Sequence, residues 1–275
     1  MQKRKIWENF LQWVLPCVLL VIALVLSIYD FNNKMEIAIQ TVVDDQAEQI
    51  GLYYAAGVED KLKALGNITD AVGSIMASRP DRSDAFLNEK LDTLMKASDA
   101  YMVIYCATNG MGFLNDRRQI DMTELNYYDS ILGESPHYLF TRTDGINGKA
   151  AFIYVCPITN YGNVNGYLLS YMEPEEMSDF FVNSIYGDKA FFSLVDRNGT
   201  IMACYGATEG TKILQNDFWN SLKGVAESLG SWTLFDRQQQ KGDKGILHVN
   251  ENGIGKILCH FPIADTDWNL VVGID

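Results

Sequence analysis

The residues from Phe10 to Tyr29 form a run of twenty consecutive positions without a charged side chain. A helix of that length is about 30 Å long, which matches the hydrocarbon core of a bilayer. A cleaved signal peptide is the alternative, but its apolar region is usually shorter, and no small-residue cleavage motif follows Tyr29. Pro16 is compatible with a membrane helix, because kinks are tolerated there. The sequence therefore predicts an uncleaved membrane anchor over residues 10–29.

Charges beside this run predict its orientation. Lys3, Arg4 and Lys5 precede it, so residues 1–9 are expected to form a cytoplasmic tail and everything after Tyr29 to lie outside the cytoplasm. The chain carries −13 in total and residues 1–9 carry +2, so the remainder carries −15. That charge argues against binding nucleic acid or an anionic membrane surface. A cationic ligand would gain from it, although an acidic surface kept for solubility explains the same charge.

Composition and motifs favour a globular protein without catalytic machinery. Hydrophobic residues make up 48% and aromatic residues 12% of the chain, which indicates a packed core after the anchor. We find no HExxH, GxSxG, phosphate-binding loop or dinucleotide fingerprint, and Gly253-Ile254-Gly255 lacks the context of one. We therefore expect no enzyme activity and no cofactor within these residues.

Helices are expected directly after the anchor. Proline is absent from Asp30 to Ser78, and an apolar face recurs at spacings of three and four, formed by Leu62, Leu65, Ile68, Val72, Ile75 and Met76. The anchor is thus expected to continue as a long stalk helix, with a bend around Gly51 to Gly57 left open. Its apolar face fits either a homodimer contact or burial against its own domain. A second helix is expected to begin near Ser83.

The pattern then changes to that of strands, and the same layout occurs twice. In the first series an Asn109-Gly110 turn follows the first strand, and a helix is expected from Asp121 to Gly133. The expected strands are 101–107, 111–114, 138–142, 151–157 and 166–172. After a connector helix bearing Met177, Phe180, Phe181 and Ile185, the second series has expected strands at 190–195, 200–204, 232–235, 245–249, 256–262 and 268–274. A helix over 214–229 is expected to bury Phe218, Trp219, Leu222, Val225 and Leu229. A tandem duplication of an antiparallel α+β module is the economical interpretation.

Three segments resemble double Cache sensor domains, the tandem PAS-like extracytoplasmic regions of bacterial chemoreceptors, histidine kinases and diguanylate cyclases. FPIADTDWNLVVGID at the end of the chain is similar to the close of a membrane-proximal Cache module, and FFSLVDRNGTIMA (191–203) to its opening hairpin. The segment 121–133, with Tyr127-Tyr128, resembles the helix over the distal pocket. The resemblance covers residues 30–275.

This resemblance implies the fold and the domain boundaries. The implied fold class is α+β: a transmembrane helix over 10–29, the stalk and second helix over 30–99, a membrane-distal Cache module over 100–175, and a connector helix with the membrane-proximal module over 176–275. Each module is expected to hold a five-stranded antiparallel sheet of order 2-1-5-4-3.

The residues alone leave two interpretations of the cysteines outside the anchor. Cys106, Cys156, Cys204 and Cys259 could form two disulfides outside the cytoplasm or serve as buried small hydrophobic side chains. In the implied strand order at least one strand separates Cys106 from Cys156, and likewise Cys204 from Cys259, so four free thiols are expected. Metal binding by them is not expected, since only three histidines occur.

The resemblance also places a small-molecule site in the distal module, where polar and aromatic side chains are concentrated. Arg142 is suited to hold a carboxylate in a bidentate pair, and tyrosines supply rigid walls with an orienting hydroxyl. Core packing or exposure is the alternative for each of them, and the strand face that lines the pocket is left open. The candidate ligand-binding residues are Tyr105, Tyr127, Tyr128, Asp129, Arg142, Asp144, Tyr154 and Tyr171.

Further expectations concern ligand and output. Amino-acid sensors of this type carry an arginine where this chain has Leu125 and an aspartate where it has Tyr171, which argues against an α-amino acid ligand and leaves a carboxylate, an amine, a purine or a sugar open. We expect a signalling receptor that acts as a homodimer through the stalk, with the proximal module as relay and with a second membrane span and an output domain, a diguanylate cyclase by resemblance, beyond Asp275. A membrane-tethered binding or scaffold protein without output is the alternative.

Overall fold

The computed structural model describes residues 2–79, 82–177, 180–181, 190–206, 217–251 and 253–274, and the side chains of residues 17 onward within these ranges. The chain forms two compact units, Met1–Gln46 and Ala47–Asp275. The first is entirely helical, and the second contains two antiparallel sheets with the helices that cover them. Ile185 and residues 214–216, which we assigned to helices, lie outside the described residues.

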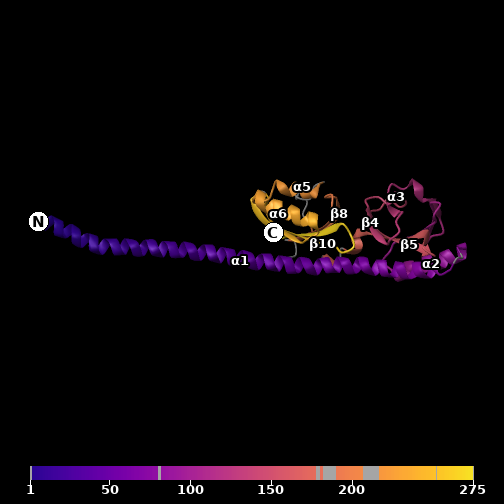
Figure 1. Ribbon diagram of the computed structural model, residues 1–275, viewed down its shortest axis with the longest axis horizontal. Coiled ribbons are helices and arrows are strands. Elements are labelled where there is room, and N and C mark those ends of the chain that lie inside the picture. Colours follow the sequence, from indigo (N-terminus) through magenta and orange to yellow (C-terminus); the bar gives the residue numbers. More distant parts are fainter. Residues whose placement is uncertain are drawn as a thin grey trace. The chain divides into compact units, whose positions relative to one another are not determined.

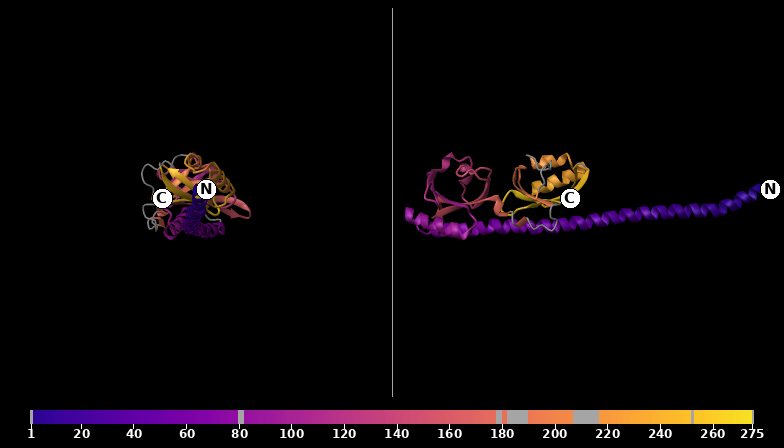
Figure 2. Two further views of the ribbon diagram at one scale, coloured as in Figure 1. Left: turned by 90° about the vertical axis from the view of Figure 1, so that its left-hand side faces the viewer. Right: turned by 180° about the vertical axis from the view of Figure 1, so that it is seen from behind.

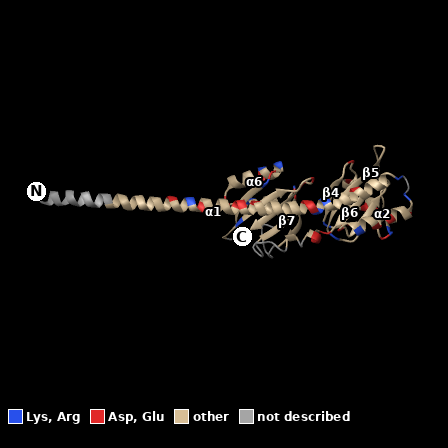
Figure 3. Cartoon of the chain, turned by 90° about the horizontal axis from the view of Figure 1, so that it is seen from below, with Lys and Arg blue, Asp and Glu red and all other residues tan. Residues whose placement is uncertain are grey.

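The first unit belongs to helix α1 (Gln2–Ala77), which is continuous. Its best 18-residue window, in the stretch that begins at Cys17, has a mean hydropathy of 1.5 and none of it is buried. It is the one helix of the described part that is long and apolar enough to cross a membrane. No charged residue lies between Cys17 and Asp30, and Figure 3 shows an uncharged run on α1 before its first acidic residue. An N-terminal apolar helix of this kind fits a single-pass membrane protein.

Residues 47–77 of α1 form a common base for both sheets (Figure 1). Glycines on this stretch allow large side chains to come close to the helix backbone. A Cβ on Gly51 would lie 1.9 Å from Phe261 of the second sheet, and one on Gly57 would lie 1.9 Å from Phe180. The glycines that suggested a bend therefore make room for packing, and the helix stays continuous through them. Leu62, Leu65, Val72 and Met76 are buried, which favours the second of the two uses left open for this apolar face, whereas Ile75 is 46% exposed.

The first sheet, which we call the distal sheet after the module that the resemblance implies, has six strands in the order β3-β2-β1-β6-β5-β4. Its strands are β1 (Met102–Cys106), β2 (Met111–Leu114), β3 (Gln119–Asp121), β4 (His137–Thr141), β5 (Ala151–Asn160) and β6 (Asn163–Met172). The order 2-1-5-4-3 is confirmed, but the short strand β3 pairs with β2 and makes the sheet six-stranded. Helix α2 (Asp84–Ala97) packs Leu91 and Leu94 into the core that this sheet shares with α1.

The second sheet, which we call the proximal sheet in the same way, has five strands in the order β8-β7-β11-β10-β9, the same order within its module. It consists of β7 (Ala190–Asp196), β8 (Ile201–Tyr205), β9 (Gly245–Glu251), β10 (Ile254–Pro262) and β11 (Trp268–Ile274). Gly110 and Gly199 have φ of 84° and 87°, values that favour glycine, in the two predicted Asn-Gly turns. The repeated strand order confirms the two-module α+β fold.

Two predicted elements differ from the structure. The segment 121–133 forms two short helices, η1 (Met122–Glu124) and α3 (Tyr128–Ile131), because the backbone is extended at Leu125 between them. Asp121 caps the first of these by accepting from the N–H of Thr123 at 3.0 Å. The second difference lies in the proximal module.

There, the predicted strand 232–235 is wrong, because it lies inside helix α6 (Leu229–Lys241). Ser228 caps this helix by accepting from the N–H of Ser231, and Trp232, Phe235 and Gln239 are buried at helical spacing. The preceding helix α5 (Phe218–Lys223) ends before Val225, and Leu229 is 68% exposed rather than buried. Figure 2 shows α5 and α6 on the opposite side of the proximal sheet from α1.

All five cysteines are free. Cys106 on β1 and Cys156 on β5 are separated by β6, and two strands separate Cys204 on β8 from Cys259 on β10. Cys106, Cys156 and Cys259 are buried, but Cys204 is exposed, so its expected role as a core side chain is wrong. A further short helix, η2 (Pro174–Met177), begins the predicted connector.

Candidate functional site

The distal sheet has two different faces. Val103 and Tyr105 of β1 pack toward α1, whereas Met102, Ile104 and Cys106 pack toward the outer side beneath η1 and α3. The outer face also holds Tyr167, Leu169 and Tyr171 of β6, which alternate along the strand. Because α3 is only four residues long, it covers this outer face incompletely, and loops complete the cover.

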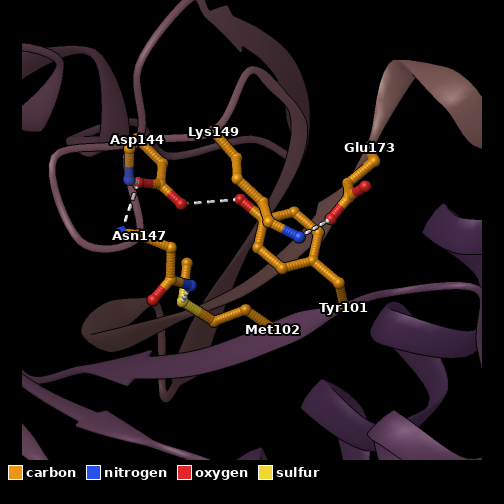
Figure 4. A network of polar contacts seen from close by, with 7 residues as sticks. Tyr101, Met102, Asp144, Asn147, Lys149 and Glu173 are labelled. Carbon is orange, nitrogen blue, oxygen red and sulfur yellow. Dashed lines mark hydrogen bonds and ion pairs between the residues drawn. The ribbon is translucent and has the colours of Figure 1, made fainter.

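Asp144, in the loop between β4 and β5, is the polar centre of this outer face. Its side chain is fully buried, and one carboxylate oxygen accepts from the backbone N–H groups of Ile146, Asn147 and Gly148 at 2.9, 2.6 and 2.8 Å. The other accepts from the hydroxyl of Tyr101 at 2.7 Å (Figure 4). Burial opposes ionisation of Asp144, but these hydrogen bonds outweigh it, so the pKa lies below its usual value. Asp144 is therefore an ionised carboxylate that fixes the loop 144–148.

The tyrosine hydroxyls continue this network inward. Tyr127 donates to the backbone carbonyl of Asp144 at 2.7 Å, and its hydroxyl lies 3.3 Å from that of Tyr171. Burial raises the pKa of Tyr127 to about 12 and raises the pKa of Tyr171, which is fully buried, well above its ordinary value. Both hydroxyls are therefore neutral and can donate or accept a hydrogen bond.

Lys149 and Glu173 close the network at its outer edge. The ammonium of Lys149 forms an ion pair with Glu173 and lies 5.3 Å from the centre of the Tyr101 ring. Burial and the Asp144 carboxylate raise the pKa of Tyr101. The amide of Asn147 donates to the sulfur of Met102 at 3.4 Å (Figure 4). These contacts tie the loop 144–149 to β1 and to the end of β6.

Two cavities flank the segment 125–127. One of about 530 Å³ opens between the segment 118–126 and the loop after β4, and Leu125, Asn126, Thr143, Gly145 and Ile146 contribute to its lining. The other, of about 500 Å³, lies between β4 and the proximal turns and includes Tyr127 and Arg142. Volumes of this size suit small-molecule ligands. Asn126 lines both cavities.

The structure brings four of the eight candidate residues together. Tyr127, Tyr128, Asp144 and Tyr171 belong to the outer face of the distal sheet. Tyr105 and Tyr154 are instead buried on the face toward α1, where Tyr105 donates to the carbonyl of Asn165 and Tyr154 to Asp70 of α1. Asp129 is exposed, and Arg142 is exposed on the 500 Å³ cavity.

Sequence reasoning omitted Tyr101, Asn126 and Lys149 from the site. Tyr101 precedes β1 and packs on the outer face, whereas alternation from Val103 and Tyr105 would put it on the face toward α1. No sequence signal marks this change, because alternation holds only within the strand. For Asn126 the one signal in the sequence is its place directly before the aromatic pair Tyr127-Tyr128. Among the described residues no group of three or more His, Cys, Asp or Glu side chains is placed to hold a metal ion.

Leu125 and Tyr171 stand where the resemblance implies an arginine and an aspartate in amino-acid sensors. Leu125 is partly buried, packs against the outer-face core and lines the 530 Å³ cavity. Tyr171 is fully buried beside Tyr127. Neither position offers a charge to a ligand, and the nearby Asp144 carboxylate is already engaged by four donors.

Comparison with known proteins gives a fold assignment. No protein-family model and no curated protein matches the chain. Among solved structures, the ligand-binding domain of the Pseudomonas fluorescens chemoreceptor CtaA in complex with L-isoleucine is similar with a TM-score of 0.67 at 12% identity, covering 86% of this chain and 94% of that one. The sensory domain of the Campylobacter jejuni chemoreceptor Tlp3 with isoleucine bound has a TM-score of 0.59 at 13% identity, with coverages of 86% and 92%.

A third solved structure belongs to a different receptor class. The extracellular domain of rpHK1S-Z16, assigned as a histidine kinase, has a TM-score of 0.63 at 16% identity and covers 85% of this chain and 95% of that one. All three are extracellular or ligand-binding sensor regions, and each is matched over both sheets. The chain thus has the α+β fold of a double Cache sensor domain, as its sequence predicts.

Proposed function

We propose that this chain is the ligand-sensing part of a membrane-anchored receptor, and that its ligand binds in the distal module on the outer face of the sheet. The observation that carries the proposal is the fixed Asp144 loop beside a cavity of about 530 Å³. The loop supplies Gly145 and Ile146 to the cavity lining, and η1 supplies Glu124. A ligand seated there would contact both the loop and the segment that leads to α3.

The ligand we propose is a small polar molecule that is not recognised as an α-amino acid. The CtaA and Tlp3 structures are complexes with L-serine, L-isoleucine and L-valine. In this chain Leu125 and Tyr171 leave no arginine and no aspartate at the positions that the resemblance assigns to reading the amino-acid backbone. Without those charges an amino-acid zwitterion would leave its charged groups unpaired, which costs affinity.

A thermal-shift screen of the 275-residue chain in detergent micelles tests this proposal. The compounds are carboxylates, amines, purines, sugars and the standard amino acids. We expect a saturable stabilisation from one of the first four classes, reduced at least about tenfold in apparent affinity by Asp144→Asn. The exposed Asp129→Asn is the matched control, and it should leave the affinity unchanged.

Two outcomes of this screen contradict the proposal. Stabilisation by amino acids that is lost in Asp144→Asn would contradict the ligand class. A hit that Asp144→Asn and a second cavity variant, Thr143→Val, both leave unchanged would contradict the site. Circular dichroism of each variant separates loss of binding from loss of folding.

For topology we propose a cytoplasmic N-terminus, supported by Lys3, Arg4 and Lys5 before the apolar helix. We further propose that the stalk pairs with a second copy, supported by exposed apolar side chains on α1 such as Ile37, Ile39 and Val42. Ligand binding would then shift the stalk, with the proximal module as relay. Cysteine crosslinking along the stalk in membranes tests the pairing, and yields identical with and without ligand would contradict the shift.

A diguanylate cyclase is the output that we propose, on the basis of the resemblance to receptors of that type. The coding sequence after Asp275 tests this directly. A second apolar run followed by a cyclase domain supports it, and a kinase or methyl-accepting domain contradicts it.

A further inference from the structure

The cavity of about 500 Å³ between β4 and the proximal turns is not lined by the Asp144 loop and has no role in the proposed function. Figure 1 shows β4 on the side of the distal sheet that faces the proximal module. The consecutive residues from Tyr138 to Arg142 all line this cavity. Because side chains alternate between the two faces of a strand, consecutive residues line one cavity together where it follows the edge of the strand. We call it the edge cavity.

The edge of β4 that faces this cavity is open. β4 is the last strand of the distal sheet and pairs with β5 alone, so alternate residues turn their backbone N–H and C=O groups to the other side. In the part of the chain that the structure describes, no hydrogen bond joins that edge to another segment. Leu139 and Phe140 are half-buried, and β4 has no lysine, proline or bulge to keep another strand away. The edge is thus able to accept an additional strand.

The acidic end of the edge cavity lies where the two sheets meet. The ring centroid of Trp268 is 6.2 Å from that of Tyr138 on β4 and 5.2 Å from that of Phe152 on β5. Asp267 precedes Trp268, Asp196 pairs with Trp268 across β7 and β11, and both aspartates line the cavity. Asp267 is exposed, and the described residues offer it no hydrogen bond or ion pair. Its carboxylate is available to a cation beside the start of β4.

The basic end is formed by Arg142, which directly follows the last residue of β4. At about 3.3 Å per residue, it lies about 13 Å along the strand from Tyr138. The side chain of Arg142 is exposed and forms no hydrogen bond or ion pair within the described ranges. A guanidinium is suited to hold a carboxylate in a bidentate pair. The edge cavity therefore has a cationic group at one end, acidic groups at the other and an open strand edge between them.

We propose that the edge cavity binds a short peptide of about three or four residues with free termini, as an additional strand parallel to β4. Its carboxylate pairs with Arg142, its ammonium group lies at Asp267, and its peptide groups form hydrogen bonds with the edge of β4. An extended peptide of this length spans about 10–13 Å, which matches the two ends, whereas a single amino acid is too short to reach both. The volume is in the range of small-ligand sites. This proposal goes beyond the proposed function, because the cavity and the ligand are different.

Calorimetric titration of the 275-residue chain in detergent micelles with trialanine tests the proposal. We expect saturable binding of one peptide per chain. Trialanine amide and N-acetyl-trialanine each lack one terminal charge and should bind at least about tenfold more weakly. The ω-aminooctanoate ion has as many bonds between its nitrogen and its carboxyl carbon but no peptide groups, so it should also bind at least about tenfold more weakly.

Substitutions at the two ends of the edge cavity test the direction of the peptide. Arg142→Gln should weaken trialanine binding at least about tenfold and leave the weaker binding of trialanine amide unchanged, because the amide has no carboxylate to pair. Asp267→Asn should weaken trialanine binding likewise and leave that of N-acetyl-trialanine unchanged. Arg237→Gln, at an exposed position of α6, and Asp60→Asn, at an exposed position of α1, are the matched controls and should leave every affinity unchanged.

Three outcomes overturn the proposal. The first is the absence of saturable trialanine binding up to about 10 mM. The second is equal affinity for trialanine and ω-aminooctanoate, which would show that the edge of β4 forms no hydrogen bonds with the ligand. The third is trialanine binding that both Arg142→Gln and Asp267→Asn leave unchanged. If Asp144→Asn then abolished this binding, the peptide would lie in the distal cavity of about 530 Å³ instead.

Discussion

The outer faces of the two sheets are built on the same strand order but are filled differently. In the distal module a four-residue helix and loops cover the face, and a network of Asp144, Tyr101, Tyr127 and Tyr171 lies beneath them beside a cavity. In the proximal module the longer helices α5 and α6 cover the face with Phe218, Trp219, Trp232 and Phe235.

The buried polar groups of the two faces also differ in their hydrogen bonding. Each carboxylate oxygen of Asp144 is hydrogen-bonded. On the proximal face the amide nitrogen of Gln239 is buried without a hydrogen-bond partner among the described residues, and the buried ring of His260 has a lowered pKa although Asn269 and the backbone of Phe235 act to raise it. Packing of aromatic rings stabilises the proximal face, and hydrogen bonds position the distal one. This difference fits a distal module that binds a ligand and a proximal module that transmits a change.

The largest effect is expected from the proximal aromatic core. Phe235 is fully buried, and its ring centroid lies 4.5 Å from that of His260. Phe235→Ala should lower the free energy of unfolding by about 3–5 kcal/mol, because it removes a large buried side chain and leaves a cavity. Urea unfolding followed by tryptophan fluorescence measures this, since Trp219 and Trp232 lie on the same face. Leu234→Ala, on the exposed side of α6, is the control. Equal losses in both would show that the face is not tightly packed.

Acid is expected to destabilise the proximal module at a higher pH than the distal module. Burial lowers the pKa of His260 to about 4, from an ordinary value of 6.5. The unfolded state therefore takes up a proton at a higher pH than the folded state, so stability falls as the pH drops from 6.5 to 4 and is unaffected above that window. The loss should reach about 3 kcal/mol at pH 4. Unfolding followed by tryptophan fluorescence at pH 7, 5 and 4 measures it.

His260→Gln is the matched variant for this pH dependence, because glutamine does not titrate. It should remove the loss between pH 6.5 and 4, whatever its effect at pH 7. The distal network behaves differently: the pKa of Asp144 is below 3.8, so its contribution is present at neutral pH and is lost only at pH values below that. If the free energy of unfolding of His260→Gln still fell between pH 6.5 and 4, the acid sensitivity would belong to another group.

A smaller effect is expected at Asp144. Asp144→Asn removes the charge and places an amide nitrogen against one of its donors, so we expect a loss of about 2 kcal/mol in unfolding free energy. Near-ultraviolet circular dichroism of the tyrosines follows this module. Asp129→Asn, which changes an exposed carboxylate nearby, should change stability by less than about 0.5 kcal/mol. If the two substitutions had equal effects, the Asp144 network would not hold the loop.

The sequence predicted the architecture because the determining signals are local. Asn109-Gly110 and Asn198-Gly199 marked the two hairpins, and the runs of β-branched and aromatic residues marked the strands. Trp232 and Phe235 were misassigned because a short apolar run fits a strand as well as a helix, and the Ser228 cap was not recognised. The strand β3 was missed because its three residues are partly exposed and carry no apolar pattern.

The candidate site was less predictable, for a physical reason. Alternation along a strand separates the residues of two faces but does not say which face meets a helix, so Tyr105 and Tyr154 were grouped with Tyr171 although they pack toward α1. The loop that brings Asp144 to Tyr101 is a contact across 43 residues that no local pattern encodes. The family resemblance pointed to the outer face of the distal sheet, and the contacts there join Tyr127, Asp144 and Tyr171 in one network.

The smallest change in unfolding free energy that tests the difference between the distal and proximal outer faces is expected for a substitution of Tyr127. Its hydroxyl donates to the Asp144 carbonyl at 2.7 Å and lies 3.3 Å from the Tyr171 hydroxyl. Tyr127→Phe keeps the ring in the core and removes one hydrogen bond, so we expect a loss of about 1 kcal/mol in unfolding free energy. Tyr161→Phe, at a position 98% exposed on the β5–β6 hairpin, is the control and should have no measurable effect. If Tyr127→Phe also had no effect, the hydroxyl would contribute nothing to holding the loop, and the distal face would depend on apolar packing as the proximal face does.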